Sequence, residues 1–140
     1  MSDKSGRSDG FTLIEILLVV AIISALAAMI VPRLTGRSEK AKRAAVEADI
    51  RANISTALKM YEIDIGFFPT TEQGLDALLK VPGGVDESAW QGAYLERKAV
   101  DPWDHPYQYK YPGEKNPSGY DLYSLGRDGV ESEDDIGNWE

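Results

Sequence analysis

The apolar run over residues 11–31 constrains the fold of this chain more than any other feature of its sequence. Only Thr12, Glu15 and Ser24 interrupt it. A helix of about 20 apolar residues crosses the hydrocarbon core of a bilayer. Pro32 follows directly, and a proline inside a helix makes it kink or pause. The run predicts a helix over residues 11–32 that lies in a membrane or against other helices.

Glu15 is the residue that an ordinary membrane span does not explain. A carboxylate at the centre of a span costs about 2.5–3.5 kcal/mol on insertion scales and is rare without a partner. Two interpretations give the Glu15 carboxylate no partner that would offset this cost. One is a secretory signal that is removed near Ala27, and the other is an uncut single-span anchor.

A third interpretation gives Glu15 a partner. If a polar leader is cut off between Gly10 and Phe11, the new chain begins with a positive amine on Phe11. Glu15 then lies one helical turn from that amine, and the start of a helix also favours negative charge. Between neighbouring subunits the same pair would define the axial register, because an unmatched buried charge costs several kcal/mol.

The sequence "G-FTLIE" followed by a long apolar helix resembles the type III signal of type IV pilins and type II secretion pseudopilins. The resemblance implies that a prepilin peptidase in the membrane removes residues 1–10 by cutting after Gly10. It further implies N-methylation of Phe11 and a role for Glu15 in assembly. Residues 11–32 would then form the transmembrane or filament-core helix, and residues 33–140 a periplasmic globular domain.

The rest of the chain predicts an α+β fold. Residues 37–65 are strongly helix-forming and precede Gly66, a good helix stop. Short strands over 107–111 and 120–125 flank a Pro- and Gly-rich turn, which predicts an antiparallel hairpin. Thr70 and Gln73 have the spacing of a capping box and predict a short helix. The apolar face of the long helix is predicted to contain Ala41, Ala44, Ala45, Ala48, Ile50, Ile54, Ala57, Leu58, Tyr61 and Ile65.

Composition and single residues argue against several functions. The net charge of −8 makes nucleic acid an improbable partner, and a chain without cysteine has no disulfide and no thiol chemistry. His105 is the only histidine and is predicted to be a turn residue, since no metal site or catalytic triad can be completed around it. The alternating tyrosines suit a small packed sheet better than a carbohydrate platform. We therefore expect a protein that is not an enzyme.

Three further segments indicate which group of pilin-like proteins this chain resembles. "FFPTTEQGLDALL", "DPWDHPYQY" and "YDLYSLGRDGVESEDDIGNW" together resemble the major pseudopilin of type II secretion systems. That family usually has glycine where this chain has Asp104. The turn around Asp104 is therefore the place where this chain differs from the family. A pilin-like fold is implied, with a long helix packed on a small C-terminal antiparallel sheet that carries a calcium-binding loop.

The acidic loop over residues 125–135 has two interpretations. From the residues alone, a solvated acidic tail is favoured, although Ile136 and Trp139 would anchor its end. The resemblance instead implies a structural Ca²⁺ ion, and hard oxygen ligands without histidine or cysteine suit that ion. Carried onto this sequence, the ligands would be the carbonyls of Leu125 and Val130 and the side chains of Asp128, Ser132 and Asp135, with Asp134 as the substitute.

The resemblance implies a structural subunit that polymerises into the periplasmic pseudopilus of a type II secretion system and drives export of folded proteins across the outer membrane. Its partners would be further copies of itself, minor pseudopilins, the prepilin peptidase and the inner-membrane secretion platform. The protein would have a single span in the bacterial inner membrane. The alternatives are a type IV pilin, a minor pseudopilin, or a secreted calcium-binding protein whose signal ends near Ala27.

Overall fold

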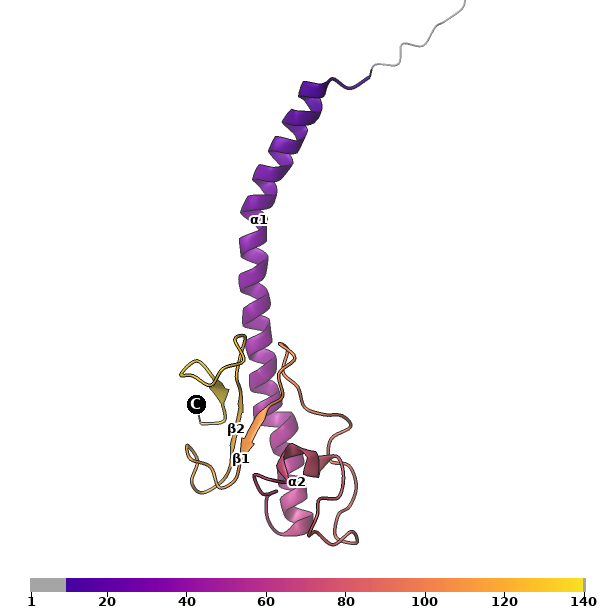
Figure 1. Cartoon of the computed structure of the whole chain (residues 1–140), viewed down its shortest axis with the longest axis vertical. Helices are drawn as coiled ribbons and strands as arrows, with labels where there is room; N and C mark the ends of the chain where they lie inside the picture. Colours follow the sequence, from indigo (N-terminus) through magenta and orange to yellow (C-terminus); the bar gives the residue numbers. More distant parts are fainter. Residues whose placement is uncertain (1–9, 140) are drawn as a thin grey trace, which may run out of the picture. The chain divides into compact units, whose positions relative to one another are not determined.

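The computed structural model describes residues 10–139, without the side chains of residues 31–35. The chain divides into two compact units, Met1–Glu39 and Lys40–Glu140, each of which is described by itself. The predicted leader falls mostly on residues 1–9, outside the described residues. The elements, shown in Figure 1, are α1 (Leu13–Ala48), η1 (Asp49–Ile54), α2 (Ser55–Ile65), η2 (Gly74–Leu78), β1 (Gln108–Lys110), β2 (Asp121–Ser124) and β3 (Ile136–Gly137).

The first unit contains the apolar part of α1. Residues Leu13–Ile30 have a mean hydropathy of 2.8, and by length and composition they form the one candidate membrane span in the described part of the chain. The Ser24 hydroxyl donates to the Val20 carbonyl at 2.7 Å, so this polar group is satisfied within the helix itself. Pro32 does not end the helix, because α1 continues through it to Ala48.

In the second unit the helix contains one wide π turn, η1, between α1 and α2. Two tyrosine hydroxyls hold this turn: Tyr107 donates to Asp49 at 3.0 Å, and Tyr120 donates to the Ser55 hydroxyl at 2.9 Å. Ser55 in turn donates to the carbonyl of Ile50, five residues earlier. Core residues that recur every four positions drift around an α-helix, and a wider turn returns them to the same side. The helix ends at Gly66, as predicted.

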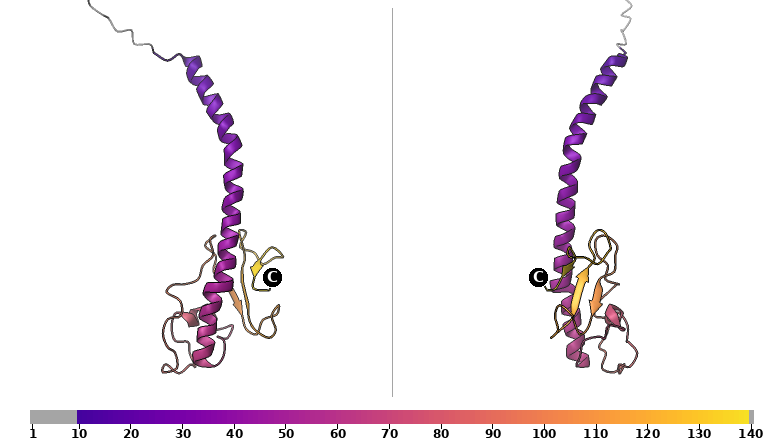
Figure 2. Two further views of the ribbon diagram at one scale, coloured as in Figure 1. Left: turned by 180° about the vertical axis from the view of Figure 1, so that it is seen from behind. Right: turned by 60° about the vertical axis from the view of Figure 1, so that its left-hand side comes forward.

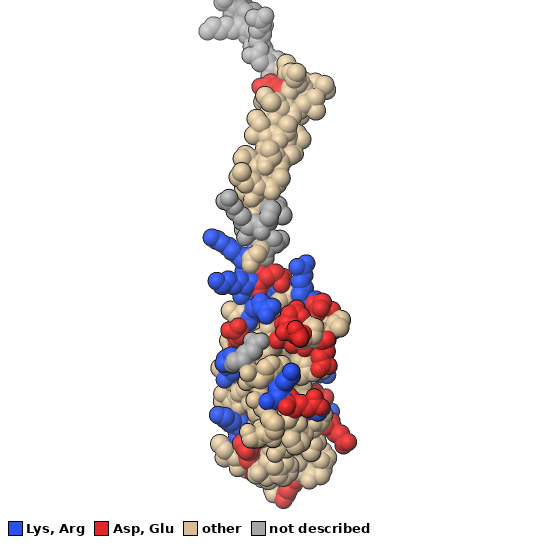
Figure 3. All heavy atoms as spheres, turned by 90° about the vertical axis from the view of Figure 1, so that its left-hand side faces the viewer, with Lys and Arg blue, Asp and Glu red and all other residues tan. Residues whose placement is uncertain are grey.

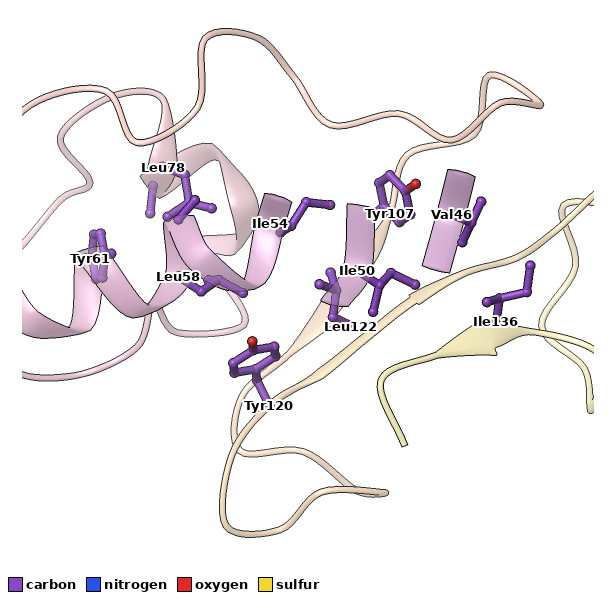
Figure 4. Close-up of a cluster of buried hydrophobic side chains, with 12 residues drawn as sticks. Val46, Ile50, Ile54, Leu58, Tyr61, Leu78, Tyr107, Tyr120, Leu122 and Ile136 are labelled. Carbon is purple, nitrogen blue, oxygen red and sulfur yellow. The ribbon is translucent and has the colours of Figure 1, made fainter. Parts of the chain in front are cut away.

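One face of this helix forms the core with the sheet and η2 (Figure 4). The predicted face is confirmed from Ile50 to Tyr61 and is wrong for the alanines before it. Ala41, Ala44, Ala45 and Ala48 are exposed, because they lie on the side of α1 opposite the buried Val46. The buried apolar residues are Val46, Ile50, Ile54, Ala57, Leu58, Tyr61, Ala77, Leu78, Tyr107, Tyr120, Leu122 and Ile136.

The sheet is antiparallel with the strand order β1-β2-β3, and β1 and β2 run beside the helix in both views of Figure 2. The predicted hairpin is confirmed, with Tyr109 opposite Leu122. The turn between its strands is organised by Asp121, which accepts the backbone N–H groups of Glu114, Lys115 and Asn116 at 2.7–2.9 Å. The third strand was not predicted. It pairs with β2 through Ile136 and so returns the end of the acidic loop to the core.

The predicted short helix is present, and the structure defines its type. The Thr70–Gln73 capping box is present, with reciprocal bonds of 3.0 and 3.2 Å between each backbone N–H and the other side chain. The element that follows is a 3₁₀ helix rather than an α-helix. Gly74 has a φ of 56°, in the left-handed region, which prevents a regular α-helix from starting at the box.

The backbone of the turn over residues 101–105 shows why glycine suits position 104, where this chain has aspartate. Asp104 has a φ of 67° and is the only residue other than glycine with positive φ in the described part of the chain. A side chain in this region is strained, although aspartate tolerates it better than most residues. Glycine, the usual residue of the resembled family at this place, carries no such strain.

Replacing Asp104 with glycine should therefore stabilise the protein by about 0.5–1 kcal/mol, because the left-handed backbone loses its strain. Asp104→Ala should destabilise it by a similar amount. Thermal unfolding of the full chain in detergent, followed by circular dichroism, measures both. A lower melting temperature for Asp104→Gly than for Asp104→Ala would contradict this explanation.

Candidate functional site

The start of α1 contains the residues predicted for processing and assembly. Gly10 and Phe11 precede the helix and are exposed, and no heavy atom would lie within 4 Å of a Cβ on Gly10. The Thr12 N–H donates to Glu15 Oε2 at 3.4 Å, and the Glu15 N–H donates to Thr12 Oγ1 at 3.3 Å. These are the two bonds of a capping box, which satisfies free donors at a helix start.

The capping role of Glu15 is a finding that the sequence analysis missed. Its signal, Thr-x-x-Glu directly before an apolar run, was visible in the sequence. Glu15 is therefore located where a carboxylate stabilises the helix start, one turn from the residue predicted to carry the new amine.

The acidic loop leaves β2 after Ser124 and ends at β3. Its first half is a turn in which Gly126 and Gly129 both have a φ of 67°. The Val130 N–H donates to Asp128 Oδ1 at 3.2 Å, so Asp128 and Val130 share this turn. In the second half, Asp135 Oδ2 accepts the Ser132 N–H at 3.2 Å, and the Ser132 hydroxyl donates to Asp134.

Asp135 is the one buried carboxylate of the loop over residues 125–135. Its residue is only 5% exposed, and its Oδ1 atom is buried without a hydrogen-bond partner. Burial raises the pKa of Asp135, the Ser132 N–H lowers it, and the negative charges of Asp134, Glu131 and Asp128 raise it further. A buried carboxylate oxygen among other carboxylates needs a cation or a proton.

The predicted calcium ligands are thus partly brought together. Asp135, Ser132 and Asp134 form one hydrogen-bonded group, and Asp128 and Val130 form another. Leu125 lies at the end of β2, where the loop begins. Among the residues that the structure describes, no three carboxylates or imidazoles form a ready metal cluster. A site here would depend on carbonyl and hydroxyl oxygens as well, a donor set that fits Ca²⁺.

A buried network attaches the loop to the turn over residues 101–105. Asp101 Oδ1 accepts the N–H groups of Trp103 and His105 at 3.0 and 2.9 Å, and Oδ2 accepts the Ser124 hydroxyl at 2.6 Å. The Ser124 hydroxyl also accepts the Gly126 N–H at 3.0 Å. Asp101 thereby connects the end of β2 to the 101–105 turn.

His105 makes the second attachment. Its Nδ1 donates to the Gly126 carbonyl at 2.9 Å, and a Cβ at position 129 would lie 3.0 Å from its ring, so Gly129 permits the close approach. The prediction that His105 is a turn residue is confirmed. Its contact with the loop was not foreseen, because about 20 residues separate the two segments and no local pattern marks their pairing.

Comparisons with known proteins agree with this arrangement. The family model described as "Type II secretion system (T2SS), protein G" matches residues 33–139, and the model of the "Prokaryotic N-terminal methylation motif" matches residues 6–31. The chain is 47% identical over 140 residues to the type II secretion system core protein G of Pseudomonas aeruginosa, with 96% of each chain covered. It is 46% identical over 136 residues to the protein of that name from Klebsiella pneumoniae, with 95% of each covered.

A solved structure gives the same result. The crystal structure of the major pseudopilin from the type 2 secretion system of enterohaemorrhagic Escherichia coli is 42% identical, with a TM-score of 0.66. The match covers 79% of this chain and 96% of that one. The long helix, the small antiparallel sheet and the methylation motif define a pseudopilin. More particularly, the chain belongs to the protein G family of type II secretion systems, the family of the major pseudopilin.

Removing the Asp101 carboxylate should break the hydrogen bonds that attach the acidic loop to the turn over residues 101–105. Asp101→Ala leaves three donors without their acceptor in a buried place, and we expect a loss of about 3 kcal/mol in the free energy of unfolding. Denaturant unfolding of the full chain in detergent measures it. The matched control is Asp76→Ala, since Asp76 is exposed and its Lys98 contact is 3.9 Å long. Equal losses for the two variants would contradict the role of Asp101.

Proposed function

We propose that this chain is the repeating subunit of a periplasmic pseudopilus, which pushes folded proteins through the outer membrane. The observation that carries the proposal is that the two family matches follow one another along the chain. The methylation motif covers the apolar helix, and the protein G model covers the domain that follows it. The motif match spans Gly10 rather than starting beyond Ala27, which favours a prepilin leader over a secretory signal. Such a subunit is structural and not an enzyme.

In this proposal, residues 1–10 are removed by a prepilin peptidase and Phe11 becomes the methylated N-terminus. Residues 11–32 anchor the subunit in the inner membrane and then enter the filament core, while residues 33–140 lie in the periplasm. The amine of Phe11 has a carboxylate one turn away at Glu15, which is exposed at the helix start. The inner-membrane secretion platform and minor pseudopilins would be the further partners.

Two roles of Glu15 can be separated by one substitution. Glutamine serves in a capping box as glutamate does, but it has no charge to pair with an amine. We therefore expect Glu15→Gln to keep the helix content of the monomer. Pseudopilus formation should fall by about tenfold or more, because the charge of the Phe11 amine is then buried without a partner. The measurements are circular dichroism in detergent and the yield of sheared filaments from cells that overproduce the secretion system.

Processing is the control for that experiment. The intact mass of the membrane protein should show a start at methylated Phe11 in both the unmodified chain and Glu15→Gln. A chain that starts at Ala28 or remains uncut at Met1 would overturn the proposed function. Normal filament yield from Glu15→Gln would show instead that capping is the whole role of Glu15.

We further propose that the acidic loop binds a structural Ca²⁺ ion. The unpartnered Oδ1 of Asp135 supports this, together with the carboxylates that surround it. The ligands would be the carbonyls of Leu125 and Val130 and the side chains of Asp128, Ser132 and Asp135. Asp134, which now accepts the Ser132 hydroxyl, would replace Asp135 if that side chain turns away. An ion here would stabilise the return of the chain from β2 to β3.

Calcium should raise the melting temperature of the protein by about 10 °C or more when its concentration exceeds the dissociation constant a hundredfold, which corresponds to about 2.7 kcal/mol. The pKa of Asp135 is raised in the folded protein without metal, so its ionisation costs stability. That cost is absent below the unfolded-state pKa and complete above the folded-state pKa. Without calcium, this group should make the protein less stable as the pH rises above about 4, the ordinary pKa of an aspartate.

Asp135→Asn tests the assignment. It should remove most of the stabilisation by calcium, while the protein without calcium keeps its stability or gains slightly, because the buried charge is gone. Glu133→Gln is the matched control and should respond to calcium as the unmodified chain does. Melting curves of the full chain in detergent, with Ca²⁺ or with a chelator, measure both. An equal calcium response in Asp135→Asn would overturn the site.

A further inference from the structure

A cleft of about 650 Å³ lies between the turn of the β1–β2 hairpin and the acidic loop. Acidic side chains gather densely on one part of the second unit in Figure 3. The walls and floor are formed by residues of three segments: Lys110, Glu114, Lys115, Asp121, Tyr123, Glu131, Ser132, Glu133, Asp135 and Trp139. Asp121, Ser132 and Asp135 have hydrogen bonds within the fold, whereas the charges of Glu131 and Glu133 have no part in it.

The hairpin side of the cleft is already satisfied. Lys110 pairs with Glu114, the ammonium of Lys115 lies 5.9 Å from the centre of the Trp139 ring, and Asp121 accepts three backbone N–H groups. The rings of Tyr123 and Trp139 lie 5.3 Å apart and supply an aromatic surface.

The loop side is only partly satisfied: the Tyr123 hydroxyl is hydrogen-bonded to the Glu131 carboxylate, and this bond leaves the charge of Glu131 without a cation. Glu131 and Glu133 are exposed and make no ion pair within the described residues. Asp135, 5% exposed, lines the same cleft with its unpartnered Oδ1 atom. Carboxylates that line one cleft form a place for a cation through their charge.

The matching cations lie on the exposed face of α1 in the second unit. Lys40 and Arg43 are exposed and make no ion pair within the described residues, whereas Lys42 is occupied over the ring of Trp103 at 5.6 Å. Ala41 and Ala44 beside them are exposed and small, so the backbone of another chain can approach this face closely.

We propose that the cleft receives the Lys40 and Arg43 side chains of a second copy of this chain. The contact joins two different surfaces, as a head-to-tail contact must, and therefore continues from copy to copy without closing. This inference rests on the proposed function, since it names surfaces through which the subunits of the filament meet. It is compatible with the calcium site, because Ca²⁺ would satisfy Asp135, and the cations of the second copy would meet Glu131 and Glu133, which are not among the proposed ligands.

The absence of cysteine from the chain allows a direct test. Two versions are produced in the same cells, one with Arg43→Cys and one with Glu133→Cys, so that a disulfide between them is always between two copies. After mild oxidation of assembled filaments, we expect a dimer of the two versions. Lys59→Cys, at an exposed cation on α2, replaces Arg43→Cys in the matched control and should give no dimer with Glu133→Cys.

Charge reversal gives a second readout. Arg43→Glu should lower filament yield by about tenfold, since like charges then face one another, and co-production with Glu133→Arg should restore it. Filaments that form normally without the dimer between positions 43 and 133 would overturn this inference and leave the proposed function intact. If the unmodified chain formed no filament at all, the proposed function would fail, and this contact with it.

Discussion

Burial of one helix face, from Val46 to Tyr61, against β2 and β3 is the interaction on which the other features of the domain depend. A sheet of three short strands is not stable by itself, and a helix that covers one of its faces supplies the missing apolar burial. The π turn keeps Ile50 and Ile54 on that face, and the hydroxyls of Tyr107 and Tyr120 hold it in place. The acidic loop begins and ends on buried residues of the same core, Ser124 and Ile136.

Three groups of charges are left incomplete in the single chain, and each is suited to a different partner. Glu15 caps its own helix at long hydrogen-bond distances and, in our proposal, later faces the amine of Phe11. Asp135 has a buried oxygen that calcium would satisfy. Glu131 and Glu133 line a cleft that, in our proposal, receives the cations of a second copy. In our proposal, a subunit built in this way gains its full stability only after processing, ion binding and assembly.

Sequence patterns were reliable where the cause is local. The stop at Gly66, the Thr70–Gln73 box and the hairpin over 107–125 follow from neighbouring residues, and all three are present. The alanines of α1 were assigned to the wrong face, because alanine suits either side of a helix and periodicity alone does not distinguish them. The two-residue strand β3 was missed, since its pairing with β2 depends on the path of the acidic loop.

The sequence by itself determined the apolar helix and the family, because these depend on residue order along the chain. It also supplied the processing point at Gly10 and Phe11 that we propose. Only the tertiary structure decided which acids have partners. Asp101 and Asp121 accept several hydrogen bonds, while Asp135 retains one oxygen without any. All three are aspartates, and residue type alone does not distinguish them. Their difference arises from burial and from donors that the fold brings to each carboxylate, over sequence separations of up to about 20 residues for Asp101.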